Sequence, residues 1–293
     1  MTKIQAKWRE SKIDLSKLNL KTIREYKVIS YPPAGNDVFD CVGTLNSGES
    51  IKFILKSERG TFANFDNEIK VLKTIKNFPV PKVIETGKVD NFTYIVMNKM
   101  DGEKLSDLFE KNKNIDRAKY LFLYGQELAK IHKIKLNWSI AKQRDINDIP
   151  TSSVYKNLDN WENEIIRYLE ETKPKIIMDT FIHGDFHYGN ILWKNYKVSA
   201  ILDWEYSGIG FKEQDIAWAL ILRPGQKFMD NVSDYKCFLS GYSSVNVFDY
   251  IKLKWCLING LLHFYLMNRN KNDNKYLLKL QDLINQLKND TFE

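Results

Sequence analysis

The chain has 293 residues, a length at the upper end of what one hydrophobic core can serve, so we expect two domains. Its 43% hydrophobic and 28% charged residues, with only 7 Pro and 14 Gly, exclude disordered and collagen-like proteins. The net charge of +7 suits nucleic acid, but residues 176–293 carry 13 basic and 13 acidic side chains, and no run of five basic residues occurs, so we expect no nucleic-acid partner.

The first hundred residues contain four segments typical of β-strands and one typical of a helix. The strand segments are short, rich in β-branched and aromatic residues, and separated by turn signals. They are Glu25–Ser30, Phe39–Leu45, Ser50–Leu55 and Thr93–Met97. Between the third and the fourth, Asn64–Ile75 has apolar residues at helical spacing, and the prolines at positions 79 and 81 end that helix. The sequence thus predicts an antiparallel meander interrupted by one helix.

After residue 102 the apolar residues repeat at helical spacing over most of the chain. The helical segments are Leu105–Lys111, Arg117–Ile134, Trp161–Glu170 and the whole of Phe248–Lys288. The exception is 181–202, where short apolar pieces are broken by glycine and asparagine. We place the domain boundary where an extended strand runs into a glycine, which gives domains 1–98 and 99–293. The expected fold class is α+β, with a small antiparallel sheet followed by a larger helical part.

Neither a secretion leader nor a membrane span is expected. Residues 1–20 are charged and polar, and polar residues interrupt the longest apolar stretch of the second half, 256–267. The three cysteines, Cys41, Cys237 and Cys256, form no C-x-x-C pair, which favours a reducing compartment over a disulfide framework. We therefore expect a cytoplasmic protein without a membrane partner.

The most informative passage is His183–Asn190, together with Asp203 at the end of an apolar strand. Three side chains that offer oxygen ligands, Asp185, Asn190 and Asp203, lie in an apolar segment, where burial of an unpaired carboxylate is costly. A charged group should therefore meet them. Mg²⁺ is usually held by one or two protein oxygens together with substrate phosphates, a task that suits Asn190 and Asp203.

The spacing of these residues is that of the catalytic set of protein kinases, in which an Asp accepts the proton of the substrate hydroxyl and an Asn five residues later binds Mg²⁺. Here the offsets are five residues from Asp185 to Asn190 and thirteen from Asn190 to Asp203. The chain departs from protein kinases at Gly184, where they have Arg, and at Glu205, where they have Gly. It also has no Ala-Pro-Glu-like anchor after Asp203, which disfavours a protein kinase.

The pattern H-G-D-x-x-x-x-N, followed by an I-x-D-W strand, resembles the aminoglycoside phosphotransferases and choline-kinase-like enzymes. Three further passages extend the resemblance over most of the chain. They are Tyr94–Glu103, Tyr124–His132 and Gly210–Ala217, in the last of which Lys212 replaces the usual Pro. The resemblance implies a protein-kinase-like fold of two lobes, a nucleotide-binding lobe over 1–98 and a helical lobe over 99–293 with the catalytic loop and the substrate pocket.

The resemblance also implies roles for the residues of these motifs that offer oxygen ligands. Asp185 is expected to receive the proton of the acceptor hydroxyl, while Asn190 and Asp203 bind Mg²⁺. Glu205 and Tyr206, two and three residues after Asp203, are expected to face the acceptor.

A kinase of this kind needs a lysine on the third strand that binds the phosphates and a glutamate on the next helix that holds it. Lys56 and Glu68 fit these positions. Lys52 has the same strand parity as Lys56, so alternation cannot separate the two lysines. We prefer Lys56 because it follows an apolar run that resembles the family's.

The nucleotide-covering turn has the weakest pattern. No G-x-G-x-x-G or P-loop motif occurs, and the turn between the first two strands offers only Gly35, Asn36 and Asp37. The backbone amides of Ala34–Asp37 can still form an anion site. By resemblance, the purine is expected against main-chain groups near Asn98 and Met100. The choice between ATP and GTP stays open.

Several other polar residues have ordinary structural explanations. The four histidines lack zinc-binding spacing; His183 is expected to orient the catalytic loop, and His132 to be satisfied in the core. Asp215 is expected either to cap a helix over 215–222 or to tie down the catalytic loop.

These patterns together predict a monomeric small-molecule kinase that transfers the γ-phosphate of ATP or GTP to a hydroxyl of an aminoglycoside-type antibiotic and so confers resistance. Aminoglycosides carry several ammonium groups, and acids of the C-terminal region can line a pocket for them. These acids are Glu205, Glu213, Asp230 and Asp234. The alternatives are a metabolic kinase for choline, ethanolamine or homoserine, because fold does not fix substrate, and a nucleotide-binding module without turnover.

Overall fold

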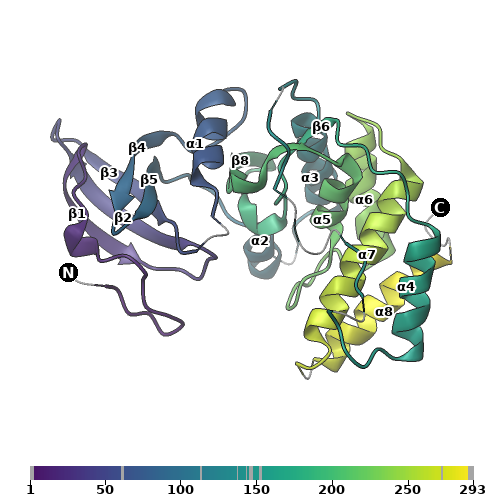
Figure 1. Cartoon of the computed structure of the whole chain (residues 1–293). Coiled ribbons are helices and arrows are strands. Elements are labelled where there is room, and N and C mark those ends of the chain that lie inside the picture. The colour runs from purple at the N-terminus through teal and green to yellow at the C-terminus, as the bar shows by residue number, and fades with distance from the viewer. Residues whose placement is uncertain are drawn as a thin grey trace. The chain divides into compact units, whose positions relative to one another are not determined.

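The computed structural model describes residues 3–60, 63–112, 114–136, 138–142, 144, 148–151, 154–271 and 273–289. The chain falls into two compact units, the first made of Met1–Gly102 and Ser199–Glu205, and the second of Glu103–Val198 and Tyr206–Glu293. Figure 1 shows the elements of both units along the chain. The units change at residue 102, and the first also takes a piece from the second half, so the expected functional domains, 1–98 and 99–293, stay a prediction.

A five-stranded antiparallel sheet forms the centre of the first unit, with the strand order β1-β2-β3-β5-β4. Its strands are β1 (Ile23–Ser30), β2 (Asp37–Leu45), β3 (Ser50–Ser57), β4 (Val83–Val89) and β5 (Phe92–Asn98). β3 pairs with β2 on one side and with β5 on the other, so Lys56 lies opposite both Val38 and Ile95. The end of β3 is therefore held from both sides.

The two faces of this sheet are covered by different segments. On one face Leu55 packs in a core cluster with the N-terminal segment. On the other face Ile95 packs against Phe65 of α1 (Phe65–Thr74). Because side chains alternate along a strand, Lys56 lies on the face that α1 covers.

One strand of this sheet, β4, is absent from the sequence-based prediction. It contains Glu85, Gly87 and Lys88 and lies at the edge of the sheet beside β5. An edge strand needs no apolar side chains on both faces, so its pattern is weak. The other four strands and α1 begin and end within two residues of the predicted positions.

The segment Ser199–Glu205 is anchored in the first unit by two buried residues. Ile201 donates its backbone N–H to Pro79 O at 2.8 Å, and the fully buried Trp204 donates its indole N–H to Ile201 O at 3.0 Å. Between these anchors Asp203 has a φ of 64°, in the left-handed region that residues other than glycine rarely adopt. The anchors thus hold Asp203 in a conformation that it would not choose alone.

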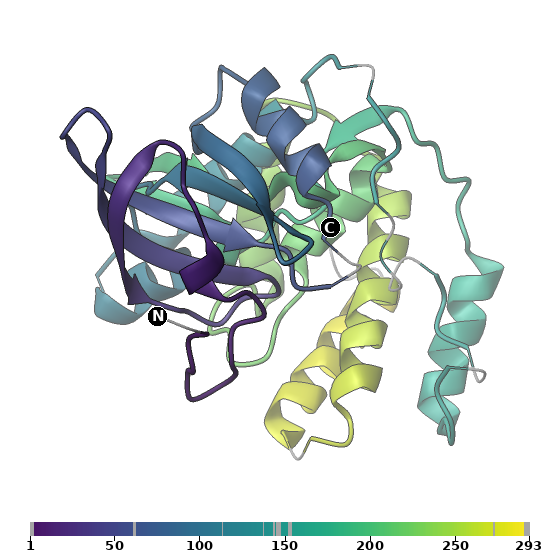
Figure 2. The same ribbon diagram turned by 60° about the vertical axis from the view of Figure 1, so that its left-hand side comes forward.

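Helices form most of the second unit. Those in the described part are α2 (Leu105–Lys111), α3 (Arg117–Ile131), α4 (Asn160–Glu171), α5 (Lys212–Leu220), α6 (Val232–Ser243), α7 (Tyr250–Asn268) and α8 (Asn274–Lys288). Five of them begin after an Asp or Asn whose side chain accepts a hydrogen bond from the first turn. These caps are Asp116, Asp159, Asn231, Asp249 and Asp273. Figure 2 shows α7 and α8, which pack together, in yellow.

Short strands flank the loop that carries the His183–Asn190 motif. They are β6 (Thr180–Ile182), β7 (Ile191–Lys194), β8 (Lys197–Ile201) and β9 (Gly208–Gly210). The 3₁₀ helices of the described chain are η1 (Leu15–Lys17), near the N-terminus, and η3 (Tyr188–Asn190) and η4 (Trp204–Tyr206), near the motif. β6 pairs with β9, and β7 with β8. The loop therefore leaves one strand pair and enters another.

Some helices differ from the prediction. α6 is absent from it, α5 begins three residues before Asp215, and the single helical stretch predicted over 248–288 is two helices, α7 and α8. A polar turn after Asn268 ends α7, and Asp273 caps the new helix. In the part of the chain that the structure describes, no helix is both long and apolar enough to cross a membrane.

Candidate active site

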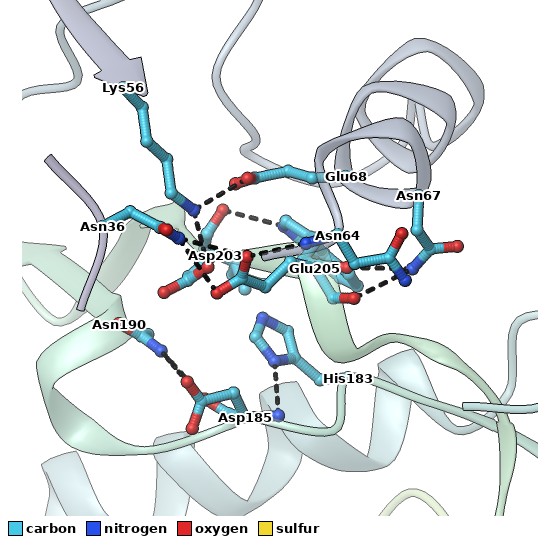
Figure 3. Close-up of polar contacts among 12 residues, drawn as sticks. Asn36, Lys56, Asn64, Asn67, Glu68, His183, Asp185, Asn190, Asp203 and Glu205 are labelled. Atoms are coloured by element: carbon cyan, nitrogen blue, oxygen red, sulfur yellow. Dashed lines mark hydrogen bonds and ion pairs between the residues drawn. The ribbon is translucent and has the colours of Figure 1, made fainter. Parts of the chain in front are cut away.

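A buried lysine of β3 meets acidic residues from two other segments of the first unit. Lys56 Nζ lies 2.7 Å from Glu68 Oε2 of α1 and 2.8 Å from Asp203 Oδ1 (Figure 3). The sequence analysis predicts that all three residues act on the phosphates of the nucleotide or on their Mg²⁺ ion, and the structure brings the three side chains into contact. Lys52, in contrast, is exposed. The geometry therefore distinguishes the two lysines that strand parity leaves equivalent.

This cluster has an excess of negative charge. Burial tends to lower the pKa of Lys56, but its carboxylate neighbours outweigh this effect and hold the pKa above its ordinary value. Burial raises the pKa of Glu68 to about 7 although Lys56 opposes the shift, and burial also raises the pKa of Glu205. Oxygens of Glu68, Asp203 and Glu205 lie within 4.8 Å of one another. Hard oxygen donors at this spacing fit a divalent cation such as Mg²⁺.

Glu205 is buried against the turn between β1 and β2. Its carboxylate accepts hydrogen bonds from Asn36 Nδ2 at 3.2 Å and from the backbone N–H of Asn64 at 3.3 Å (Figure 3). Asn36 is buried, and the preceding Gly35 is exposed. The described contacts of Glu205 are thus with the predicted nucleotide turn and the start of α1. Its expected place at the acceptor stays a prediction.

The predicted purine-binding connection follows β5. Asn98 donates its backbone N–H to Lys82 O at 3.1 Å, and its side-chain oxygen accepts the N–H of Lys82 at 2.6 Å. Its Nδ2 lies 3.2 Å from Met100 Sδ. These contacts fix the chain between Asn98 and Met100, and the binding of a purine there stays a prediction.

Asp185 and Asn190 close a loop in the second unit. Asn190 Nδ2 donates to Asp185 O at 3.0 Å and to Asp185 Oδ2 at 3.2 Å (Figure 3). Trp218 Nε1 of α5 donates to Asp185 Oδ1 at 2.8 Å. These donors fix the orientation of the carboxylate. Because Asn190 uses its amide nitrogen in both bonds, its amide oxygen is the atom that could ligate a cation.

The backbone of this loop is held by Asp215 of α5. Its carboxylate accepts the N–H of His183 at 2.9 Å and the N–H of Gly184 at 3.0 Å. Burial tends to raise the pKa of Asp215, but the hydrogen bond and charge of His132, 3.0 Å away, outweigh it and lower the pKa. Asp215 lies inside α5, so of the two roles left open by the sequence, the structure shows the contact with the loop.

His183 and His132 both have hydrogen-bond partners in the second unit. His183 Nδ1 accepts the N–H of Asp185 at 3.2 Å, and His132 Nδ1 lies 2.7 Å from Tyr242 Oη. Both histidines are buried. They orient the loop and its supporting carboxylate.

An arginine and a tryptophan beside Asp185 have no signal in the sequence. Arg144 Nη2 lies 2.8 Å from Asp185 Oδ1, in an ion pair. The Arg144 guanidinium lies 4.0 Å from the ring centroid of Tyr206 and 4.3 Å from that of Trp218, within the range of cation–π attraction. Tyr206, expected at the acceptor, is thus linked to Asp185 through Arg144. A lone arginine in a loop gives no local pattern that would have identified it.

Two acids expected to line an acceptor pocket are engaged with backbone groups of the second unit. Glu213 Oε1 accepts the N–H of Asp249 at 2.9 Å, and Asp234 Oδ2 accepts the N–H of Met229 at 2.7 Å. Both side chains are buried. Their described contacts are structural, so they contribute little to a pocket for ammonium groups.

The chain is similar to known phosphotransferases. Residues 36–247 match the model of the phosphotransferase enzyme family. An aminoglycoside 3'-phosphotransferase of Enterococcus faecalis is 26% identical over 209 residues, which cover 62% of this chain and 74% of that relative. An enzyme of the same name from Staphylococcus aureus is 26% identical over 188 residues, which cover 55% of this chain and 66% of that relative.

Solved structures share the fold. A thermostable mutant of aminoglycoside phosphotransferase APH(4)-Ia, in a ternary complex with AMP-PNP and hygromycin B, has a TM-score of 0.62 at 16% identity and covers 93% of this chain and 95% of its own. A choline/ethanolamine kinase family protein from Mesorhizobium loti has a TM-score of 0.62 at 14% identity, with 92% and 90% covered. The predicted α+β, protein-kinase-like fold is confirmed.

Proposed function

Because this chain belongs to the phosphotransferase enzyme family and is a phosphotransferase with an alcohol group as acceptor, we propose that it transfers the γ-phosphate of ATP or GTP to a hydroxyl of an aminoglycoside-type antibiotic. The observation that carries the transfer reaction is the ion pair of the buried Lys56 with Glu68 and Asp203. The acceptor class rests on the aminoglycoside 3'-phosphotransferases among the relatives. The reaction would take place in the cytoplasm and confer resistance.

On the donor side, phosphoryl transfer needs positioning and charge neutralisation, because the transition state spreads negative charge over several oxygens. In this proposal Lys56 binds the phosphates, and Glu68 holds the lysine in place. Asp203 and the amide oxygen of Asn190 are the ligands for Mg²⁺, which when bound neutralises phosphate charge. The close oxygen donors around Asp203 support a cation there.

The nucleotide itself would be held by backbone groups of the first unit. The turn at Gly35 and Asn36 covers the phosphates, and main-chain groups near Asn98 and Met100 bind the purine. The fixed geometry of the connection after β5 supports this assignment.

On the acceptor side, Asp185 orients the hydroxyl and receives its proton. Hydrogen bonds from Trp218 and Asn190 support this role, because they aim the carboxylate without neutralising it. Tyr206 contributes an aromatic surface beside it.

A second candidate is a metabolic kinase for a small ammonium compound such as choline, ethanolamine or homoserine. One observation favours it. The rings of Tyr206 and Trp218 flank the guanidinium of Arg144 beside Asp185, and the same two rings suit a small ammonium group. The structural engagement of Glu213 and Asp234 points the same way, because it removes acids that a polycationic antibiotic would use.

The experiment is Mg²⁺-dependent release of nucleoside diphosphate, with ATP and GTP in parallel, across aminoglycosides, macrolides, choline, ethanolamine and homoserine. Asp185→Asn should lower turnover about 10²- to 10⁴-fold, as expected for loss of a general base. The matched control is Asp179→Asn, at an exposed position one residue before β6. Turnover with choline alone would replace the antibiotic by the metabolic acceptor. Nucleotide binding without any turnover would leave a binding module.

A further inference from the structure

Arg9 precedes residues 36–247, which match the family model, and its side chain holds the turn between β1 and β2. Arg9 Nη1 donates to Gly35 O at 3.2 Å, and Nη2 donates to Asn36 O at 2.6 Å. Its Nε donates to Tyr31 Oη at 3.0 Å. All three nitrogens of the guanidinium thus bind the same turn, and two of them bind successive carbonyl groups.

The guanidinium is itself fixed from behind. It lies 4.2 Å from the ring centroid of Trp8, whose indole N–H donates to Tyr31 O at 3.1 Å. Its Nη2 lies 3.3 Å from Oδ1 of Asp37, a fully buried carboxylate that also accepts a hydrogen bond from Arg59 at 2.9 Å. Stacking, charge and hydrogen bonds therefore restrict Arg9 to one orientation. Because the guanidinium is planar, this orientation also fixes the carbonyl groups that its nitrogens bind.

Peptide planarity turns these contacts into an orientation of N–H groups. In a trans peptide the C=O and the N–H of the next residue point in opposite directions. Because Arg9 binds the carbonyls of Gly35 and Asn36, the N–H groups of Asn36 and Asp37 point away from Arg9. Asp37 pairs with Ser57 of β3, so the N–H of Asn36 is the turn amide that can bind an anion.

Other contacts link this turn with the acidic cluster that holds Lys56. Asn36 Nδ2 donates to Glu205 at 3.2 Å, and Glu205 is one of the three carboxylates around the Lys56 ammonium (Figure 3). Phosphates that meet Lys56 are therefore within the neighbourhood of the Asn36 amide.

We infer that Arg9 is a positioning residue for the nucleotide: it holds the turn so that the N–H of Asn36 binds the phosphates. This inference rests on the proposed function. The turn has a single glycine and no glycine-rich motif, so its binding geometry needs an external brace. That brace comes from a segment outside residues 36–247, the part that the family model covers. A turn that is already ordered loses less conformational entropy when the nucleotide binds.

The test compares the affinity for MgATP with that for adenosine, which has no phosphates, by isothermal titration calorimetry. Arg9→Ala should weaken MgATP binding about tenfold and leave adenosine binding within about twofold, because only phosphates use the turn. In turnover assays KM for ATP should rise by the same factor, with kcat unchanged at saturation. The matched control is Arg24→Ala, an exposed arginine of β1 whose ion partner is the adjacent Glu25.

A second variant separates the fork from its charge. Arg9→Lys keeps the charge that pairs with Asp37, but a single ammonium cannot hold two carbonyls in a fixed plane. We expect MgATP binding to stay at least about fivefold weaker than in the unaltered chain. Full affinity in Arg9→Lys would overturn the role of the fork.

Other outcomes are equally clear. Equal losses for MgATP and adenosine in Arg9→Ala would mean a general structural defect, and no loss would mean that the turn does not need Arg9; both overturn the inference. Failure of the proposed function looks different, because then Lys56→Met would leave MgATP affinity unchanged and Asp185→Asn would leave turnover unchanged. Thermal denaturation of each variant verifies that it is folded.

Discussion

A buried ammonium group is stable only where carboxylates surround it, and Lys56 has Glu68 on one side and Asp203 on the other. One lysine does not balance three acids. A divalent cation would neutralise the remaining negative charge, and burial together with the nearby Asp203 carboxylate raises the pKa of Glu68. In the proposed function Lys56 therefore acts on the phosphates, in addition to its ion pairs with Glu68 and Asp203.

We therefore predict that Lys56→Met lowers kcat/KM for ATP about 10²- to 10³-fold, the range seen when one preorganised donor to a transition state is removed. Lys52→Met, on the same strand and with the same parity, should change it less than about twofold, because Lys52 is exposed. Steady-state kinetics at saturating acceptor measures both. If Lys52→Met were the damaging change, the assignment of the two lysines would be reversed.

Arg144 occupies a position beside Asp185 that an acceptor cation could also take. Its Nη2 is close to the carboxylate but has no hydrogen-bond partner of suitable geometry among the described residues, so the contact is ionic. Stacking between Tyr206 and Trp218 adds to it. An ammonium group that approaches Asp185 from this side must displace the guanidinium.

It follows that Arg144→Ala should lower KM for an ammonium-bearing acceptor about fivefold while kcat stays within about twofold, because a competing internal cation is removed. Methylguanidinium should then inhibit Arg144→Ala competitively against the acceptor and have at least about a tenfold weaker effect on the unaltered enzyme. Arg167→Ala, at an exposed site on α4, is the control. A fall in kcat that methylguanidinium restores would instead make Arg144 a support of Asp185.

At the scale of elements, sequence patterns succeed where burial is one-sided and caps are strong. Burial alternates along β2 over 37–41, and α3 begins at Arg117 after its cap Asp116, whose side chain accepts a hydrogen bond from the first turn. The edge strand β4 and the three-residue β9 are missed because neither needs a continuous apolar pattern. α6 is missed because glycine and several serines blur its periodicity, although Asn231 caps it.

The candidate site shows the same division between local and distant information. The motif residues Asp185, Asn190 and Asp203 can be named from spacing and residue type, because phosphoryl transfer restricts both. Arg9 and Arg144 cannot, because their importance comes from partners distant in the chain, such as Gly35, 26 residues after Arg9. An isolated arginine has many possible partners, and only the folded chain selects one.

At the scale of the whole molecule, the first unit is not a continuous piece of chain. It needs Ser199–Glu205, which brings Ile201 and Trp204, both fully buried, into its core. The same seven-residue segment supplies Asp203 to Lys56 and Glu205 to Asn36. A boundary drawn once along the sequence, at 98 or at 102, therefore separates the unit from part of its own core.

This interleaving predicts how fragments of the chain behave. Residues 1–102 alone lack the buried Trp204 and leave Lys56 with Glu68 as its remaining described acidic partner. The fragment for comparison is 1–102 joined through a Gly/Ser linker to 197–205. We expect the free energy of unfolding of 1–102 alone to be at least about 3 kcal/mol lower than that of the joined fragment. Urea denaturation monitored by circular dichroism measures the difference. A fragment with the same tail in scrambled order controls for the linker and for composition, and should resemble 1–102 alone. Equal midpoints for the native and scrambled tails would mean that the first unit is complete without the segment, and that Asp203 is brought to Lys56 by other parts of the chain.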